Sequence, residues 1–372
     1  MQEKAGILCG FVVLAAAVFG GCGERADETA EDGANARSDS NAAPEISTEE
    51  STYLSNLRQL TYGGENAEGY FSFDEASFVF QRTRPELGDS CDQIHTYDIA
   101  SGQTRAISDG RGRTTCAYYL PGDSLVLYAT TGLVEADCPP TPDYSQGYVW
   151  SLYPSYDIVV ADTAGRFVRQ LTDTPGYDAE ATVSPTGDRI VFTSMRTGDL
   201  ELYSMNLDGT DVIQLTDSPG YDGGAFYSWD GSQIVFRASR PTGDDLSEYQ
   251  RLLGENLIRP GALEIFVMNA DGSNVRQVTD NGAANFGPFW HPDGRHIIFS
   301  SNMDDPKGRE FDLYLVAADG TDLQRITTTP AFDGFPMFTR DGKQLIFASN
   351  RNNASEGETN LFLASFRLPP TP

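Results

Sequence analysis

Residues 170–192 read QLTDTPGYDAEATVSPTGDRIVF, and residues 214–236 read QLTDSPGYDGGAFYSWDGSQIVF, which is nearly the same pattern one unit later. Each stretch opens with a run that ends in a hydroxyl residue. Each closes with a glycine-containing turn and an apolar run of β-forming residues. Self-similarity of this kind is the sequence signature of a repeat protein. The fold therefore depends on how many times the unit occurs along the chain.

The unit occurs six times. The runs that end in a hydroxyl residue finish at Thr61, Ser108, Thr172, Thr216, Thr279 and Thr327. The turns that precede an apolar run lie at positions 74, 122, 186, 230, 293 and 341. With the further apolar run that follows, each unit predicts four antiparallel strands, a to d, with tight turns between a and b and between c and d. Six such units predict an all-β fold, a six-bladed β-propeller.

The two ends of the repeat region complement each other. The last c strand, residues 361–364, has no hydroxyl-ending run after it. An unpaired run of this kind, residues 57–61, precedes the first a strand. We expect this N-terminal run to supply strand d of the last blade, because that removes the open edge that a ring of blades otherwise carries.

The repeated turn, the apolar b strand, the Asp-Leu-Tyr-like c strand and the Leu-Thr ending resemble the TolB-like propeller family over roughly residues 53–368. This resemblance, to a family with WD-like propeller repeats, implies a periplasmic or surface-exposed binding protein. The family also includes propellers fused to peptidases and some polysaccharide lyases. Since propellers host many unrelated activities, the resemblance defines the expected fold more sharply than the function.

The N-terminus has the composition of an export signal rather than of the fold. An apolar run, residues 5–19, leads to the sequence GGC at residues 20–22, which resembles the lipobox of bacterial lipoproteins. The resemblance implies a signal peptide over residues 1–21 and lipidation of Cys22, with Gly23 typical of delivery to the outer membrane. A plain secretory signal, cut at the small residues, is the alternative.

Residues 22–52 are rich in acidic residues and poor in large apolar side chains, so they predict a flexible tether between lipid and domain. The propeller then occupies residues 53–368, and residues 369–372 form a short tail. Together these features predict a lipid-anchored protein of the bacterial cell envelope, held at the outer membrane and facing the periplasm or the cell surface. We expect a monomer.

Composition excludes several classes of function. The chain has 54 acidic and 26 basic residues, a formal charge of −28. This balance argues against nucleic-acid binding, which needs Lys and Arg to replace phosphate counterions, and against docking by charge on an anionic lipid surface. Three histidines leave little room for a His-based metal or acid–base centre, and no Gly-x-Ser-x-Gly elbow marks a nucleophile. We therefore expect no cofactor, apart from the divalent cation considered below.

Every long excursion of the chain lies between a b strand and a c strand, and long loops in a compact domain are commonly functional. The excursions span residues 84–93, 130–156, 240–263, 302–311 and 350–359. Strand alternation places them on one face, together with the connections from d to a, so we expect this loop-rich face to bind the ligand. The Pro- and Tyr-rich loop of residues 130–156 suits peptide or sugar contacts, or packs onto the rim of the propeller.

Polar residues recur where each a strand begins on this face. Asp178, Asp222 and Asp333 are the acidic members of the first column, and Glu68 and Glu180 stand two positions after it. These carboxylates are candidates for holding a divalent cation, or a basic group of a partner, at the mouth of the central channel. Alternatively, the first column forms Asx turns. Four arginines end b strands on the same face and either pair with these acids or bind a terminal carboxylate: Arg84, Arg196, Arg240 and Arg351.

Three cysteines besides Cys22 remain in the predicted mature chain: Cys91, Cys116 and Cys138. An exported chain permits disulfides, and three thiols predict one bridge and one free thiol. We favour a bridge between Cys91 and Cys116, because it joins a b–c loop to the neighbouring d–a loop. A zinc site made by all three thiolates is the alternative.

The leading prediction for function is a lipid-anchored binding scaffold, rather than an enzyme, that holds a protein, peptide or glycan on the loop-rich face. The alternative is a hydrolase or lyase that acts on a peptide or polysaccharide, with acidic residues and a cation at the channel mouth. The sequence names no ligand for either function.

Overall fold

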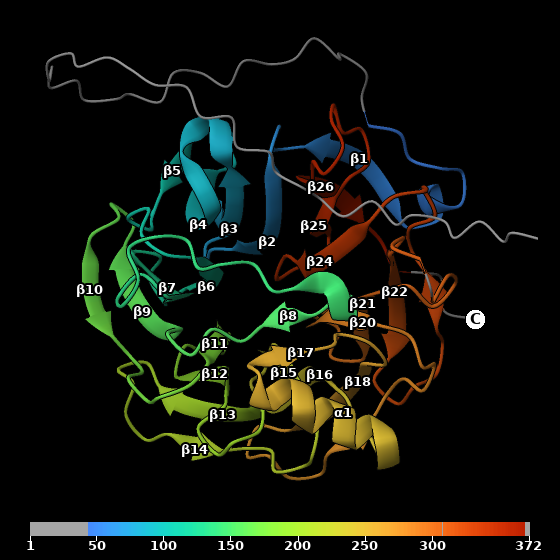
Figure 1. The fold of residues 1–372 in the computed structure, drawn as a ribbon. Coiled ribbons are helices and arrows are strands. Elements are labelled where there is room, and N and C mark those ends of the chain that lie inside the picture. The colour runs from blue at the N-terminus through green and yellow to red at the C-terminus, as the bar shows by residue number, and fades with distance from the viewer. Residues whose placement is uncertain (1–43, 307, 369–372) are drawn as a thin grey trace, which may run out of the picture. The chain divides into compact units, whose positions relative to one another are not determined.

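The computed structural model describes residues 44–306 and 308–368. The predicted signal peptide (1–21), the predicted lipid anchor Cys22, the predicted tether up to residue 43 and the tail at 369–372 lie outside the described residues. Within the described residues, the chain forms six four-stranded antiparallel sheets that are the blades of a propeller (Figure 1). The predicted all-β, six-bladed fold is confirmed. No helix among the described residues is long and apolar enough to cross a membrane.

In blades 1 to 3 the four strands follow one another in sequence from the channel to the rim. Blade 1 contains β2 (Glu65–Phe71), β3 (Ser77–Arg84), β4 (Asp89–Asp98) and β5 (Thr104–Ala106). Blade 2 contains β6 (Thr114–Tyr119), β7 (Leu125–Thr130), β9 (Asp157–Asp162) and β10 (Phe167–Gln170). Blade 3 contains β11 (Asp178–Val183), β12 (Arg189–Ser194), β13 (Glu201–Asn206) and β14 (Ile213–Gln214).

The same order holds in the next two blades. Blade 4 contains β15 (Asp222–Tyr227), β16 (Gln233–Ala238), β18 (Glu264–Asn269) and β19 (Arg276–Gln277). Blade 5 contains β20 (Asn285–Trp290), β21 (His296–Ser301), β22 (Asp312–Ala317) and β23 (Gln324–Arg325). The tight turns between a and b and between c and d lie on one face of the propeller, which we call the short-turn face.

Blade 6 combines the two ends of the described chain. It contains β24 (Asp333–Phe338), β25 (Gln344–Ser349), β26 (Asn360–Phe366) and, as its outer strand, β1 (Leu54–Gln59). β1 runs antiparallel to β26, with Leu54 opposite Phe366. Leu54 and Leu57 are 1% and 7% exposed and pack in the core. The predicted closure of the ring by the N-terminal strand is confirmed.

The hydroxyl residue that ends each repeat accepts a hydrogen bond from a backbone N–H at the start of strand c. Thr172 Oγ1 accepts from Ile158 at 2.9 Å, and Thr61 Oγ1 accepts from Leu361 at 2.8 Å across the closure. The same bond forms in the other four blades. Each such bond contributes about 1 kcal/mol and fastens the short outer strand to its blade. Ser or Thr therefore recurs at this position for a structural reason.

The apolar b strands supply the core of each blade. A phenylalanine recurs in these strands and is 1% exposed or less in five of the blades: Phe80, Phe192, Phe236, Phe299 and Phe347. Full burial of one such side chain contributes about 1.5–3 kcal/mol. The Ile-Val-Phe pattern is thus repeated because these side chains are needed for the packing of blade against blade.

Two long loops meet above the blades on the loop-rich face. The loop of residues 130–156 contains β8 (Trp150–Ser151), and the loop of residues 240–263 contains α1 (Gly243–Gly254) and β17 (Leu257–Ile258). β8 and β17 pair antiparallel, near the centre of the ring (Figure 1). We call these two paired loops the cap. Three short 3-10 helices complete the described elements: Glu50–Thr52, Pro85–Leu87 and Tyr144–Gln146.

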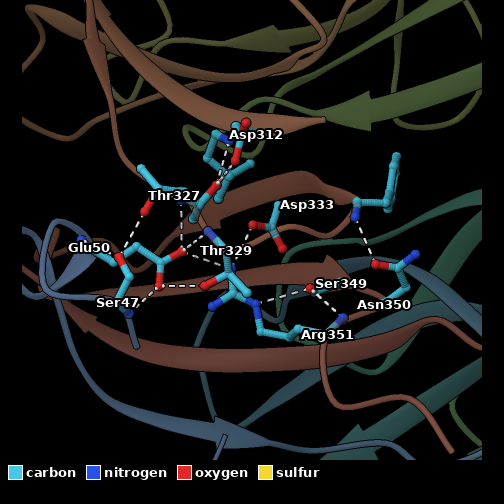
Figure 2. A network of polar contacts seen from close by, with 12 residues as sticks. Ser47, Glu50, Asp312, Thr327, Thr329, Asp333, Ser349, Asn350 and Arg351 are labelled. Carbon is cyan, nitrogen blue, oxygen red and sulfur yellow. Dashed lines mark hydrogen bonds and ion pairs between the residues drawn. The ribbon is translucent and has the colours of Figure 1, made fainter. Parts of the chain in front are cut away.

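The predicted boundary between tether and propeller at residue 53 is wrong. Residues 47–52 pack against the propeller, and Glu50 is 0% exposed. Its carboxylate accepts backbone N–H bonds from Thr328 at 2.9 Å and Thr329 at 3.1 Å. It also lies 3.2 Å from Arg351. Figure 2 shows Glu50 beside Thr329 and Arg351. The ordered domain therefore starts upstream of the repeats, and it starts with an acidic residue that composition alone assigns to the tether.

Candidate functional site

The innermost strand of every blade carries a β-bulge near its loop-rich end. One residue of each bulge has a φ between 52° and 58°, and these six equivalent residues are Glu68, Cys116, Glu180, Gly224, Gly287 and Phe335. Glycine adopts this conformation without cost, whereas the other side chains are strained there. Strained residues cluster at binding and catalytic sites. The bulges therefore identify the loop-rich end of the channel as the candidate site.

Glu180 is the centre of a buried polar cluster at this end. Its carboxylate accepts hydrogen bonds from Tyr221 Oη at 2.8 Å, from Thr193 Oγ1 at 2.7 Å and from Gly224 N at 3.0 Å. It also forms an ion pair with Arg237. Glu180 and Arg237 are 8% and 7% exposed. All of the carboxylate's bonding capacity is thus used within the fold.

Glu68 and Cys116 lie beside this cluster, and we call these two residues with Glu180, Tyr221 and Arg237 the vestibule. The Cys116 thiol is hydrogen-bonded to the Glu68 carboxyl group. The buried Oε2 of Glu68 has no hydrogen-bond partner among the described residues. Burial raises the pKa of Glu68 to about 7, and the charge of Glu180 adds to the effect, whereas Cys116 and Arg237 oppose it. Burial also raises the pKa of Cys116, so its thiol stays protonated and is a poor nucleophile.

The cap covers the vestibule. Trp150 of β8, Tyr221 and Phe286 place their rings 5.4–5.5 Å from the Arg237 guanidinium, at cation–π distance. Leu152 of the cap belongs to the same buried apolar cluster as Tyr221. The predicted ligand-binding carboxylates Glu68 and Glu180 therefore lie beneath the cap. A macromolecular partner on this face meets the outer surface of the loops first.

Three of the four predicted arginines pair with the predicted aspartates of the first column. The pairs are Arg196 with Asp178 at 3.2 Å, Arg240 with Asp222 at 2.6 Å and Arg351 with Asp333 at 2.6 Å. These aspartates are at most 1% exposed. Arg84 differs, because it pairs with the exposed Glu86 at 2.7 Å. The structural use of the arginines is thus present in blades 3, 4 and 6.

Asp222 also faces a second carboxyl group, Glu201 of β13 in the neighbouring blade. The two carboxyl groups interact electrostatically, and each has one buried oxygen, Glu201 Oε2 and Asp222 Oδ2, without a hydrogen-bond partner among the described residues. A proton shared between the two carboxyl groups satisfies both oxygens. Burial raises the pKa of Glu201 to about 8, and the charges of Asp222 and Asp199 raise it further, while Thr216 opposes them.

This pair predicts a stability that falls as the pH rises. A carboxyl group with a raised folded-state pKa binds more protons in the folded than in the unfolded chain between the two pKa values, so the free energy of unfolding decreases across that window. For Glu201 the window runs from 4.5 to about 8. We expect Glu201→Gln to raise the free energy of unfolding by roughly 1–3 kcal/mol at about pH 9, and to change it little at about pH 5.

Chemical denaturation of both proteins across this pH range measures the difference. Glu264 is the matched control, because it stands at the equivalent place in blade 4 and faces Asn285, which donates to it at 3.1 Å. Glu264→Gln should destabilise at every pH, since both of its oxygens accept bonds that an amide cannot all replace. A Glu201→Gln variant that is destabilised at about pH 9 as well would show that no proton is shared.

The predicted disulfide between Cys91 and Cys116 is wrong. Cys91 is bonded to Cys138, and Cys116 is the free thiol of the vestibule. Cys91 belongs to β4 rather than to the preceding loop, and there it meets the loop of residues 130–156. The predicted count of one bridge and one free thiol is confirmed. The alternative of a three-thiolate zinc site is excluded, because two of the three sulfurs are bonded to each other.

A resident divalent cation at the channel mouth does not fit the described side chains. No group of three or more His, Cys, Asp or Glu residues in the described part of the chain is arranged to hold a metal ion. Four of the five carboxylates that the sequence offers for this purpose form ion pairs with arginines instead: Asp178, Glu180, Asp222 and Asp333. We derive no chemistry through a metal.

Sequence reasoning missed Arg237, Tyr221, Glu201 and Glu50. Arg237 has a signal that is visible afterwards, because it is a charged residue in the otherwise apolar b strand Ile-Val-Phe-Arg-Ala. Glu201 opens a c strand, a place that an acidic residue also takes in blades 2, 4 and 5, as Asp157, Glu264 and Asp312. Tyr221 directly precedes Asp222 of the first column, and nothing in the sequence marks Tyr221 itself as a site residue.

The fold and the site define a class of protein: a six-bladed β-propeller with a capped channel at its loop-rich end. No family model matches the chain. The curated Tol-Pal system protein TolB of Bordetella pertussis is 40% identical over 53 residues, which are 14% of this chain and 12% of that protein. The homologous protein of Bordetella parapertussis gives the same values. The match therefore spans a small part of the length of these relatives.

Solved structures extend the likeness to the whole propeller. The putative TolB from Agrobacterium tumefaciens has a TM-score of 0.51 at 18% identity, covering 82% of this chain and 91% of that chain. TolB from Acinetobacter baumannii has a TM-score of 0.52 at 16% identity, covering 75% and 63%. A gluconolactonase from Xanthomonas campestris has a TM-score of 0.55 at 13% identity, covering 88% and 95%. The chain is a TolB-like six-bladed β-propeller, and identities this low show the fold alone.

Proposed function

We propose that this protein is an exported, lipid-anchored scaffold of the bacterial cell envelope that binds a protein, peptide or glycan through its loop-rich face. The observation that carries the proposal is a set of exposed apolar side chains on the b–c loops of blades 1 and 2. We call them the loop patch: Leu87, Leu133, Val134, Tyr144 and Tyr148, which are 40–71% exposed. Large exposed apolar side chains that gather on one face are typical of interaction sites.

The loop patch is held in place before any partner arrives. The disulfide between Cys91 and Cys138 ties the longer loop to β4, the strand that follows the shorter loop, and Tyr153 Oη donates to the Pro140 carbonyl at 2.8 Å within the longer loop. The Tyr144 and Tyr148 rings are stacked with centroids 6.2 Å apart. A rigid surface loses little conformational entropy on binding, and tyrosine supplies both apolar area and a hydroxyl to a partner. Both properties support binding rather than a structural role for these loops.

The similarity to a Tol-Pal system protein supports a partner among the proteins of an envelope assembly. A lipid anchor at Cys22 keeps the scaffold at the membrane while the loop-rich face remains available. The acidic balance of the chain supports a partner with basic or neutral groups at the contact, because like charges across an interface are costly.

Paired substitution of the loop patch tests the binding proposal. We expect Tyr144→Ser with Tyr148→Ser to weaken binding of a partner, identified by cross-linking in intact cells, by about tenfold or more, because buried tyrosines are common hot spots of interfaces. The matched control is Val212→Ser with Ile213→Ser, which removes apolar side chains of similar exposure from the rim of blade 3. Equal loss of binding in both pairs, or in neither, would refute the loop patch as the interface.

Fractionation of cells tests the anchor. Cys22→Ser removes the thiol that the lipoprotein interpretation requires, so the variant should remain unprocessed or become soluble, whereas the unmodified protein sediments with membranes. Cys116→Ser is the control, because this free thiol lies inside the propeller and leaves the anchor intact. If Cys22→Ser still partitions with membranes as the unmodified protein does, another means of attachment replaces the anchor, whereas an unmodified protein that is itself soluble would favour the plain secretory alternative.

A further inference from the structure

The opposite end of the channel, on the short-turn face, is hollowed. All six blades contribute side chains to this hollow, which we call the axial pocket. Its walls are mostly apolar and include Phe71, Phe73, Phe226, Trp229, Phe289 and Met337. The axial pocket has a cavity volume of about 30 Å³, and the empty space reaches about 460 Å³ when the open solvent at its mouth is counted. The axial pocket therefore suits a small group rather than a folded partner.

Aromatic rings close the floor of the axial pocket. Phe226 contacts Tyr70 of the opposite blade with ring centroids 5.4 Å apart, and it contacts Phe289 at 5.2 Å and Tyr118 at 6.3 Å. These rings meet on the propeller axis and separate the axial pocket from the vestibule. A ligand of the axial pocket is consequently independent of the binding that we propose for the loop-rich face.

Two hydrogen-bond donors line the axial pocket without partners. Tyr118 is 6% exposed, yet its hydroxyl has no hydrogen bond within residues 44–306 and 308–368. Burial raises the pKa of Tyr118, and the nearby Arg340 guanidinium opposes the shift only in part, so the hydroxyl keeps its proton and donates. The hydroxyl can therefore donate to a ligand oxygen in the axial pocket, which Tyr118 lines.

Arg340 is the second donor. In the described part of the chain its guanidinium belongs to no ion pair and stacks 5.2 Å from the ring of Trp229. Trp229 is itself fixed, because its Nε1 donates to the Trp290 carbonyl at 2.9 Å. The exposed guanidinium thus lies at the mouth of the apolar hollow that Tyr118 also lines.

The acids around the mouth are engaged elsewhere. Glu75 accepts the backbone N–H of Arg340 rather than bonding its guanidinium. Asp123 accepts the backbone N–H groups of Phe73 and Asp74 at 2.7 and 3.0 Å. The negative charges of Glu75 and Asp123 repel a polyanion near the mouth. A single carboxylate that reaches Arg340 directly is attracted by the guanidinium, which offsets this repulsion.

We propose that the axial pocket binds a small aliphatic monocarboxylate, with its carboxylate on Arg340 and Tyr118 and its short apolar chain among the aromatic walls. The two free donors match the two oxygens of one carboxylate, and the apolar walls match an alkyl chain. The small enclosed volume favours a free acid over the C-terminus of a folded partner.

Ligand-observed NMR on the folded, soluble propeller tests this site with isovalerate as the probe and isovaleramide as its uncharged match. We expect isovalerate to show saturation transfer and isovaleramide to show none. Arg340→Gln should abolish the signal, and Tyr118→Phe, which removes only the hydroxyl, should weaken binding about tenfold. Arg295→Gln is the control, since Arg295 lies in a turn of the same face but is paired with Asp322 at 2.6 Å.

Each other outcome overturns the proposal. Equal signals for acid and amide would mean that the apolar walls bind without the donors. Loss of binding in Arg295→Gln as well would indicate general attraction of anions to the face. Absence of binding by isovalerate, together with binding of a short peptide that ends in valine, would replace the free acid by a peptide C-terminus. None of these results bears on the loop patch, whose variants are tested separately.

Discussion

A chain that begins at Tyr62 is expected to lose the folded propeller, whereas a chain that begins at Pro44 keeps it. The shorter chain lacks β1, so β26 has no outer partner and blade 6 has an open edge. It loses several backbone hydrogen bonds, at about 1 kcal/mol each, and the burial of Leu54, Leu57 and Leu60, at about 1.5–3 kcal/mol each. That sum is comparable with the whole stability of an ordinary domain, about 5–15 kcal/mol.

Thermal and chemical melts of three truncations measure the effect. The chains begin at Pro44, Tyr53 and Tyr62, and the middle one keeps β1 but lacks Glu50. We expect two distinct steps of destabilisation, the second of which leaves no cooperative transition. If the chain from Tyr62 melts cooperatively at the temperature of the chain from Tyr53, the pairing of β1 with β26 does not close the ring.

The propeller could be predicted because the same local physics repeats six times. Each unit needs an apolar b strand for the core, a tight turn before it and a hydroxyl that bonds strand c, and each need leaves a residue type at a fixed place, as Phe192 and Thr172 show. The closure followed from counting strands, since an unpaired run at one end matched a missing strand at the other. A strand that is misassigned in one repeat can be recognised by comparing that repeat with the other five.

The site was predicted less well because the contacts of the vestibule and the disulfide occur once and are not repeated from blade to blade. The positive φ of Glu68 and Glu180 leaves no mark on these residues, although the glycines Gly224 and Gly287 at equivalent positions were a usable sign. The disulfide depends on where a long insertion folds back, which no repeat reports. For the three Asp–Arg contacts the sequence left open whether these side chains pair with each other or bind a ligand. A carboxylate that pairs with arginine and one that binds a ligand look the same in sequence.

The N-terminal segment illustrates how composition misleads when one residue matters. Residues 22–52 are acidic overall, but Ser47 and Glu50 have the spacing of a capping box. Ser47 N donates to the Glu50 carboxylate at 2.9 Å, and Glu50 N donates to Ser47 Oγ at 3.1 Å. This reciprocal pair sets the turn that carries Glu50 into the groove between blades 5 and 6. Local pattern, rather than average composition, was the informative signal.

Glu50→Gln is expected to destabilise the propeller by about 1–3 kcal/mol, because buried donors lose a charged acceptor, while Arg351 keeps its ion pair with Asp333. Glu50 and Arg351 are 0% and 5% exposed, so water cannot replace the lost contact. The carboxylate accepts from Thr328, Thr329 and Arg351 together, as Figure 2 shows. An amide offers a single acceptor and turns its NH₂ group toward other donors, which leaves them unsatisfied.

The pH dependence of this loss has a definite sign. Burial raises the pKa of Glu50, but the charge of Arg351 and the N–H groups of Thr328, Ser47 and Thr329 outweigh burial and lower it. A lowered folded-state pKa gives stability that is present above the unfolded value of 4.5 and is lost as the pH falls through the folded value. Urea unfolding should therefore separate Glu50→Gln from the unmodified protein at neutral pH and bring the two together in acid.

The neighbouring Glu49 is the matched control, because it is one residue away, has the same charge and is exposed. Glu49→Gln should change the free energy of unfolding by no more than about 0.5 kcal/mol, as surface substitutions usually do. Equal effects of the two substitutions would mean that Glu50 acts only through the net charge of the segment. A larger effect at Glu50 that persists unchanged in acid would mean that packing of the side chain, and not its ionisation, holds the segment on the propeller.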